Sequence, residues 1–210
     1  MSAASVEQPF DDEFFSTVPE KPFSLVTIAD EIMERHPGYR VEILGGHLLV
    51  TPSPDAAHSR ALTKLMRPFI AAGLDDGDSE VHQGISLWLP AAEDYVIPDL
   101  AVVDAGIDDH LIERNAYDPV CFRLVLEVTS GNWKNDLKAK VGAYAEARVP
   151  VYVVVDRKHQ RLHVLTEPSE GGYGVHRVHA PGETVTLPDS IGAEVTLDVG
   201  QIIEAGQPKG

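Results

Sequence analysis

Apolar side chains recur with the 3.6-residue period of an α-helix in three segments of the chain. The clearest pattern predicts a helix over about 56–72, with Asp55 as its N-cap. Shorter or weaker patterns predict helices over 28–35 and 133–148. These helical segments are separated by long stretches in which the apolar residues follow a different pattern.

Between the helices, the apolar pattern is that of β-strands. Alternating apolar residues predict strands over 81–89 and 95–103. The runs 122–128 and 151–155 are almost entirely apolar, which is typical of central strands covered on both faces. The order of the core is therefore helix, three strands, helix, strand. We expect an α/β domain with a mixed central sheet and added N- and C-terminal strands.

Length and composition indicate one globular domain with short tails. The 210 residues are 43% apolar and 24% charged, which is ordinary for such a protein. We expect a flexible acidic tail over 1–22, a single domain over 23–203 and a flexible tail over 204–210. No apolar run approaches the roughly 20 residues that cross a bilayer, and no secretory signal opens the sequence. The expected location is cytoplasmic, without a membrane partner.

The net charge of −16 matters for any interaction with nucleic acid, because nucleic-acid binders usually carry a basic surface. The acidity is uneven. Residues 1–20 and 75–80 are strongly acidic, whereas Lys and Arg outnumber Asp and Glu over 130–165. One interpretation is a solvated acidic surface that keeps the protein soluble. The other is a set of acidic edges around one basic region, and total charge does not separate the two.

Two carboxylates lie in strands where apolar residues are expected. Asp99 follows Pro98 in the strand over 95–103, and Glu127 lies near the end of the apolar run 122–128. A buried carboxylate needs a cation, a metal ion or a hydrogen-bond donor. Two of them near the ends of neighbouring strands suggest a hard cation bound through oxygen. The alternative is two strand-end acids that reach solvent or cap a loop.

Lys140 lies on the inward side of the helix predicted over 133–148. With about 100° per residue, it falls about 40° from Tyr144, a member of the apolar stripe. A lysine on the buried side needs an anionic partner, and the candidates are the two strand carboxylates or a bound phosphate. The alternative is a pair with Asp136 one turn earlier, with the ammonium group reaching outward to solvent.

Pro98-Asp99, Glu127 and Lys140 together resemble the active-site motif of the PD-(D/E)XK nuclease superfamily. The lysine that this motif places two residues after the glutamate is absent, since that position is Thr129. A lysine that has migrated to the following helix is a variant within the superfamily, and Lys140 fits it. The resemblance implies a restriction-endonuclease-like core.

Over about residues 25–200, the chain also resembles a bacterial family described as putative restriction endonucleases of unknown function. The residues that carry this resemblance are Glu42, Gly46, Thr51-Pro52-Ser53-Pro54, His58, Val125-Leu126-Glu127-Val128-Thr129-Ser130, Asn132-Trp133, Asp136, Lys140, Tyr144, Val149-Pro150, Tyr152 and Asp156. Val151 and Val153 stand where the family often has Glu and Trp. These departures affect packing and remove no candidate ligand.

The resemblance implies a role for each motif residue. Asp99 and Glu127 would bind Mg²⁺ or Mn²⁺, helped by the carbonyl group of Val128. Lys140 would orient or activate the attacking water and balance charge on the phosphate. His58 stands where the first helix of this fold often contributes a metal-site residue, although a structural hydrogen bond at the start of a helix fits it equally.

Two further acids, Glu42 and Asp136, would hold the ligands in place from outside the coordination sphere, and Tyr144 is expected in the core. The implied activity is that of a metal-dependent endonuclease that hydrolyses phosphodiester bonds, with DNA as the expected substrate. Two alternatives stay open: a catalytically silent nuclease fold that binds or regulates, and hydrolysis of another phosphate ester. Because glycine-paired hairpins at 45–46 and 171–172 can leave sheet edges that pair between chains, a homodimer is expected.

Overall fold

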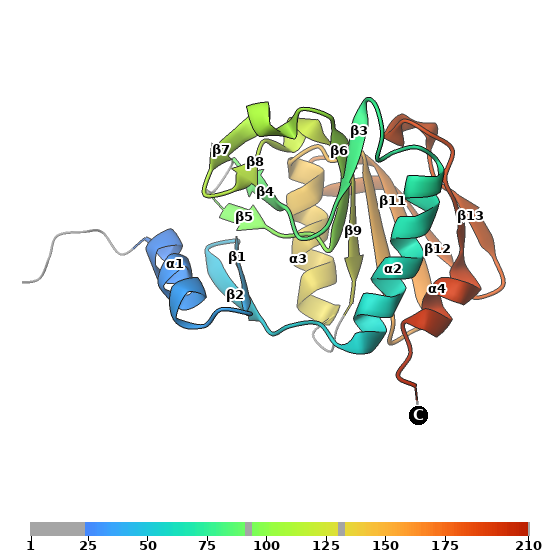
Figure 1. Cartoon of the computed structure of the whole chain (residues 1–210), viewed down its shortest axis with the longest axis horizontal. Helices are drawn as coiled ribbons and strands as arrows, with labels where there is room; N and C mark the ends of the chain where they lie inside the picture. Colours follow the sequence, from blue (N-terminus) through green and yellow to red (C-terminus); the bar gives the residue numbers. More distant parts are fainter. Residues whose placement is uncertain (1–23, 91–93, 130–132, 210) are drawn as a thin grey trace, which may run out of the picture.

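The computed structural model describes residues 24–90, 94–129 and 133–209, without the side chains of residues 133–137. Within these ranges the chain forms two six-stranded sheets and one two-stranded sheet, with helices beside and between them (Figure 1). The helices are α1 (Leu25–Arg35), α2 (Ala56–Ala71), α3 (Trp133–Glu146) and α4 (Val199–Ala205), with short 3₁₀ helices at Ile107–His110, Pro119–Cys121 and Asp189–Ile191. None of the helices in the described ranges is long and apolar enough to cross a bilayer.

The main sheet is mixed and has the strand order β12-β11-β10-β9-β6-β3. Its strands are β3 (Ser79–His82), β6 (Leu100–Asp104), β9 (Phe122–Val128), β10 (Val151–Asp156), β11 (Arg161–Ser169) and β12 (Gly172–His179). β9 and β10 are parallel, and α3 forms the crossover between them. The other neighbours are antiparallel. The expected α/β domain with a mixed central sheet is therefore confirmed.

The second sheet has the order β2-β1-β5-β4-β8-β7. Its strands are β1 (Arg40–Leu44), β2 (His47–Thr51), β4 (Ser86–Leu89), β5 (Asp94–Val96), β7 (Leu111–Glu113) and β8 (Ala116–Tyr117). A separate antiparallel pair joins β13 (Thr184–Thr186) and β14 (Thr196–Asp198). The strands expected near both ends of the chain thus extend the core: β1 and β2 in the second sheet, β11 and β12 in the main one.

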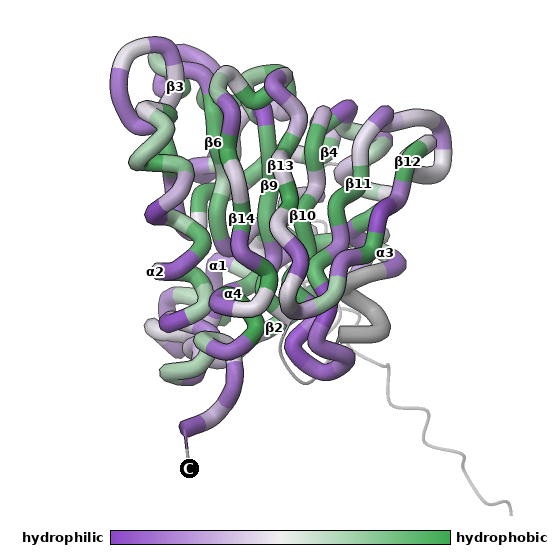
Figure 2. Tube along the Cα trace, turned by 90° about the vertical axis from the view of Figure 1, so that its right-hand side faces the viewer, coloured by the Kyte–Doolittle hydropathy of each residue, from purple (hydrophilic) through white to green (hydrophobic). Residues whose placement is uncertain are grey.

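Apolar side chains cover the main sheet on both faces. On one face, Phe69 of α2 packs in a cluster with Leu124 and Val153. On the other, Tyr144 of α3 and residues of the second sheet pack with strand residues such as Tyr152. Figure 2 shows the apolar residues concentrated along the strands, with hydrophilic residues frequent on the helices and loops around them. This two-sided burial explains why β9 reads as an almost uniform apolar run.

The two strands predicted from alternating residues are each divided between the two sheets. The segment 81–89 supplies the end of β3 and all of β4, with Gly84 at a φ of 65° in the turn between them. The segment 95–103 supplies parts of β5 and β6, divided at Pro98, which has no N–H group to donate to a ladder. The prediction of two long strands was therefore wrong. The second crossing places Asp99 where the two sheets meet.

The ends of the domain also differ from the expectation. α1 begins at Leu25 with Ser24 as its N-cap, three residues before the predicted start. α4 runs past the boundary expected at residue 203, because Asp198 caps it and its apolar residues pack against the core. The carbonyls of Gly206 and Gln207 then accept hydrogen bonds from arginine side chains. The predicted tail therefore begins too early, and the tail predicted over 1–22 lies outside the described residues.

Candidate active site

The strand register brings Asp99 and Glu127 together. β6 and β9 are antiparallel, with Leu100 opposite Leu126, so extending the register by one residue places Asp99 opposite Glu127. Residues opposite each other project from the same face of a sheet. The backbone N–H of Val128 also donates a hydrogen bond of 2.8 Å to Asp99 Oδ2. Asp99, directly before β6, and Glu127 on the adjacent β9 therefore lie on one face, as the sequence predicts.

Asp99 is a buried carboxylate with three donors. Arg40 Nη1 lies 2.8 Å from its Oδ1, and His58 Nε2 lies 3.3 Å from its Oδ2. Burial alone would raise the pKa of Asp99, but His58, Arg40 and the Val128 N–H outweigh it and lower the pKa to about 2. Asp99 is consequently ionised at neutral pH.

Local structure explains how His58 reaches this position. Asp55 caps α2 as predicted, and its side chain accepts a hydrogen bond of 2.6 Å from the backbone N–H of His58. The cap fixes the first turn of α2, so the buried His58 ring meets Asp99 across the end of the sheet. The sequence left open whether His58 serves a metal site or makes a structural hydrogen bond, and the structure shows its contact with Asp99.

Glu127 faces α3. Its Oε1 accepts hydrogen bonds from Lys140 Nζ at 2.8 Å and from the hydroxyl group of Tyr144 at 2.9 Å. Burial raises the pKa of Glu127 well above its ordinary value, Lys140 opposes the rise, and the charges of Asp99 and Glu42 add to it. Tyr144 is part of the core, as expected, but its hydroxyl group also belongs to the site.

Lys140 is the buried cation of the site. Its Nζ lies 2.8 Å from Glu127 Oε1 and 2.9 Å from Glu42 Oε1. Burial by itself would lower the pKa of Lys140, but the two carboxylates more than offset it and raise the pKa above its usual value. The alternative of an ammonium group that reaches outward is therefore wrong. The side chain of Asp136 lies outside the described residues.

Glu42 connects the second sheet to the site. Its Oε1 accepts a hydrogen bond of 2.7 Å from the backbone N–H of Ile97, in the crossing segment that carries Asp99, as well as contacting Lys140. Glu42, Asp99 and Lys140 are each only 3% exposed. One glutamate on β1 thus holds both the crossing segment and the lysine of α3.

Thr129 occupies the position where the superfamily motif usually has its lysine. Its backbone N–H and hydroxyl group both donate to the carbonyl of Val155, at 3.0 and 3.2 Å, and its hydroxyl accepts from the N–H of Arg157. The threonine therefore ties the end of β9 to the end of β10. The lysine that contacts Glu127 is Lys140 on α3.

Sequence reasoning missed Arg40. It lies two residues before Glu42 on β1, and residues two apart on a strand share a face. The signal was therefore present as a second charged residue on the inward face of a strand. Recognising it requires knowing that β1 packs beside the crossing segment, where Arg40 also donates to the carbonyl of Ile97.

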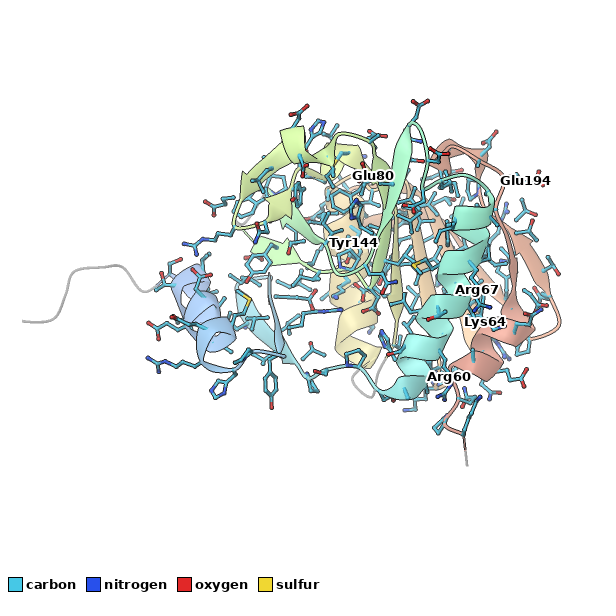
Figure 3. All side chains as sticks on the ribbon, in the orientation of Figure 1. Arg60, Lys64, Arg67, Glu80, Tyr144 and Glu194 are labelled. Atoms are coloured by element: carbon cyan, nitrogen blue, oxygen red, sulfur yellow. The ribbon has the colours of Figure 1, made fainter. Side chains whose placement is uncertain are left out.

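These side chains line one cleft of about 510 Å³. Its lining residues are Gly38, Tyr39, Arg40, Glu42, Thr51, Pro52, Ser53, Pro54, Asp55, His58, Asp99, Glu127, Val128, Thr129, Lys140, Tyr152, Val154 and Arg157. Glu42, His58, Asp99, Glu127, Val128 and Lys140, all predicted from sequence, are thus brought together. Figure 3 shows the labelled Tyr144 at the centre of the molecule, between the second sheet and α2.

The donors in the cleft fit a hard divalent cation. Asp99 and Glu127 offer carboxylate oxygens, and Val128 lies beside both. Within the described part of the chain, no three His, Cys, Asp or Glu side chains form a ready-made cage for a metal ion. Mg²⁺ does not require one, because it commonly binds through one or two carboxylates together with substrate phosphate and water. Since Arg40 and His58 hold the oxygens of Asp99, a cation there would share or displace these contacts.

The model of the family described as "Uma2: Putative restriction endonuclease" matches residues 29–200. The chain belongs to this family. Membership confirms the predicted PD-(D/E)XK-type relationship and supports a nuclease function in general. Restriction-endonuclease-like proteins generally use divalent metal ions, and nucleic acid is the class of substrate that a nuclease family suggests.

A solved structure shows the same fold. The chain is similar to a structure described as a putative nuclease belonging to DUF820 from Anabaena variabilis, with a TM-score of 0.61 and 13% sequence identity. The similarity covers 80% of this chain and 91% of that one. At this identity the likeness concerns the fold alone, and it agrees with the restriction-endonuclease-like core of the Uma2 family. None of the curated proteins matches the chain.

Proposed function

We propose that this Uma2-family protein is a divalent-metal-dependent endonuclease that hydrolyses phosphodiester bonds in DNA. The observation that carries the proposal is the buried Lys140, held between Glu127 and Glu42 in the cleft that also contains Asp99. Burying a lysine among several acids costs free energy of desolvation, and such clusters of ionisable groups are concentrated at functional sites. A site that binds a metal ion and a phosphate requires this combination of charges.

Asp99, Glu127 and the carbonyl group of Val128 would hold Mg²⁺ or Mn²⁺. When bound, the ion would polarise a phosphoryl oxygen and lower the pKa of its water. The charges of the protein favour this binding. Three acids, Glu42, Asp99 and Glu127, contact only two permanently charged cations, Lys140 and Arg40. Burial is the main cause of the raised pKa of Glu127, and the charges of Asp99 and Glu42 raise it further.

Lys140 would act as a fixed positive charge. Because its pKa is raised, it keeps its proton and cannot serve as the general base. It would therefore orient the attacking water and balance charge on the phosphate, rather than remove a proton. Glu42 would be a positioning residue, since its contacts are with Lys140 and with the backbone that carries Asp99.

Two arginines of the cleft would contact the substrate. The side chain of Arg40 keeps 30% of its surface exposed, so its remaining donors can reach a phosphate oxygen. Arg157 lies at the cleft beside Asp55. Lys140 and Arg157 both belong to the basic stretch 130–165, which favours the interpretation of acidic edges around a local basic region.

The first prediction is that the protein nicks supercoiled plasmid DNA when Mn²⁺ or Mg²⁺ is added, and that EDTA abolishes nicking. The measurement is the loss of supercoiled DNA on agarose gels over a titration of each metal ion. Asp99→Asn, purified in parallel, is the control for contaminating nucleases, because it removes one ligand charge and keeps the shape of the side chain. Equal nicking by Asp99→Asn would contradict the assignment of the site.

A catalytically silent binding module is the second candidate, and the net charge of −16 favours it. It would neither nick DNA nor hydrolyse a small phosphodiester under any metal ion. Hydrolysis of a small phosphodiester without cleavage of DNA would instead indicate another phosphate ester as the substrate. The same plasmid assay, combined with a small chromogenic diester, separates these outcomes.

The second prediction is that the protein is a homodimer. One strand of each glycine hairpin lies at a sheet edge: β2 in the second sheet and β12 in the main sheet. Val50 of β2 and Val178 of β12 are exposed. Edge strands with exposed apolar residues invite pairing between chains, and two-fold dimers are the commonest oligomers. Light scattering at micromolar protein concentration should give twice the chain mass of 22.8 kDa. A monomeric mass would contradict this prediction.

A further inference from the structure

The structure contains a basic stripe on α2, outside the catalytic cleft. Arg60, Lys64 and Arg67 are four and three residues apart, so they project from one side of the helix within an arc of about 60°. Figure 3 shows the three labelled side chains one after another along α2, beside α4. The 16 residues of α2 include no Asp or Glu, although the chain carries a net charge of −16.

A groove of about 480 Å³ runs along this stripe between α2 and α4. Its lining residues are Ser59, Arg60, Thr63, Lys64, Arg67, Gln201, Glu204, Ala205 and Lys209. Four of these are basic and one is acidic, so the groove is locally positive. The hydroxyl groups of Ser59 and Thr63 donate to the backbone carbonyls of Asp55 and Ser59, so the basic side chains are the groups left to meet a ligand.

The stripe is continuous with the catalytic cleft. Arg157, which lines the cleft, donates a hydrogen bond of 2.8 Å to the carbonyl of Gly206, and Arg60 donates one of 2.9 Å to the carbonyl of Gln207. The two arginines are thus held by neighbouring carbonyls just after α4. From Arg60, the stripe continues along α2 to Arg67, away from the cleft.

We propose that this stripe binds the phosphate backbone of the DNA duplex on one side of the cleaved bond. The proposal rests on the nuclease function proposed above. From Arg60 to Arg67 the helix rises about 10 Å, and each strand of B-DNA presents a phosphate about every 3.4 Å along the axis. The stripe therefore matches about three successive phosphates of one strand. Such contacts set register and affinity without reading sequence.

The test uses Lys64→Gln/Arg67→Gln in the full chain. Both side chains are exposed, whereas Arg60 is left intact because it anchors the segment after α4. The matched control is Arg35→Gln/Arg177→Gln, which removes two exposed basic charges from α1 and β12. The probe is a fluorescein-labelled DNA duplex, followed by anisotropy over a range of salt concentrations with Ca²⁺ present to neutralise the carboxylates.

The stripe variant should bind roughly 10- to 60-fold more weakly than wild type at 0.1 M salt, with a salt slope about 1.8 less steep, since each phosphate contact contributes about 0.9. The control variant should change much less. Hydrolysis of bis(p-nitrophenyl) phosphate in Mn²⁺ should be the same in all three proteins, because this diester is too small to reach the stripe.

Equal affinities and slopes for the stripe variant and the control would overturn the stripe while leaving the nuclease proposal intact. Hydrolysis of the small diester by wild-type protein without DNA binding would overturn the stripe and point to another phosphate ester. Absence of both DNA binding and hydrolysis in the wild type would overturn the proposed function as well.

Discussion

Lys140→Met is expected to lower the rate of DNA cleavage by about 10²–10³-fold, the usual effect of removing one charge-stabilising donor from an active site. The methionine keeps an unbranched stem of similar length. It removes the positive charge that Lys140 brings to the oxygens of Glu127 and Glu42. Under the proposed mechanism, the attacking water and the phosphate then lose one of the two cations of the site, and only Arg40 remains.

The same substitution should also destabilise the fold, because it leaves two buried carboxylates without their cation. Removing one partner of a buried ion pair costs about 3–5 kcal/mol, which corresponds to a melting temperature lower by about 6–20 °C for a chain of this size. The loss should be largest at alkaline pH. It should shrink as the pH falls and Glu127, whose pKa is already raised, takes up a proton.

Three further variants separate the chemical role of Lys140 from its structural one. Lys138→Met is the matched control, since Lys138 is exposed on the same helix, and it should keep full activity and stability. Glu42→Gln/Lys140→Met removes one of the unpaired carboxylates and should recover part of the lost stability, without recovering cleavage. Glu42→Gln alone measures how far the glutamine itself changes the melting temperature and the cleavage rate. Lys140→Met is compared with wild type, and the double variant is compared with Glu42→Gln. If either variant without Lys140 cleaves DNA as fast as its reference protein, the lysine has no role in the mechanism.

The sequence indicates the central residues of the site because each breaks a pattern. Asp99 and Glu127 interrupt apolar strands, and Lys140 falls on the inward side of a helix. In a core, charged residues at such positions need partners. The pattern does not say which partners they contact. The sequence therefore predicts Glu42 near the site but does not predict its direct contact with Lys140.

Other parts of the site depend on tertiary structure. Arg40 reaches Asp99 only because the chain crosses between two sheets at Pro98, and alternation alone predicts one continuous strand there. Periodicity continues across such a crossing, because both strands bury one face against the same core. α4 was missed for a related reason: its seven residues, Val199–Ala205, are too few for helical periodicity to stand out beside a neighbouring strand.

Glu127→Gln is expected to abolish metal-dependent cleavage and, in EDTA, to raise the melting temperature. The folded protein holds a proton on Glu127 more tightly than the unfolded chain does, because its pKa is raised above the usual 4.5. Stability is therefore lost as the pH rises above that usual value, and it is regained as the pH falls. Glutamine cannot ionise, so the Glu127→Gln variant should melt a few degrees higher than wild type at pH 8. The difference in melting temperature should vanish near pH 4. Lys140 keeps Glu42 as its partner in this variant.

The response to metal distinguishes a ligand from an ordinary buried acid. Mn²⁺ or Mg²⁺ should raise the melting temperature of the wild type at pH 8, because an ion that binds only the folded state stabilises it by mass action. Glu127→Gln should show little of this increase. Glu80, labelled in Figure 3, is a partly exposed acid of β3 that pairs with Val103, at the opposite end of β6 from Asp99. Glu80→Gln should therefore keep both the metal response and the cleavage. A Glu127→Gln protein that melts lower than wild type in EDTA at pH 8, yet gains as much from metal, would show that Glu127 serves the fold and not the ion.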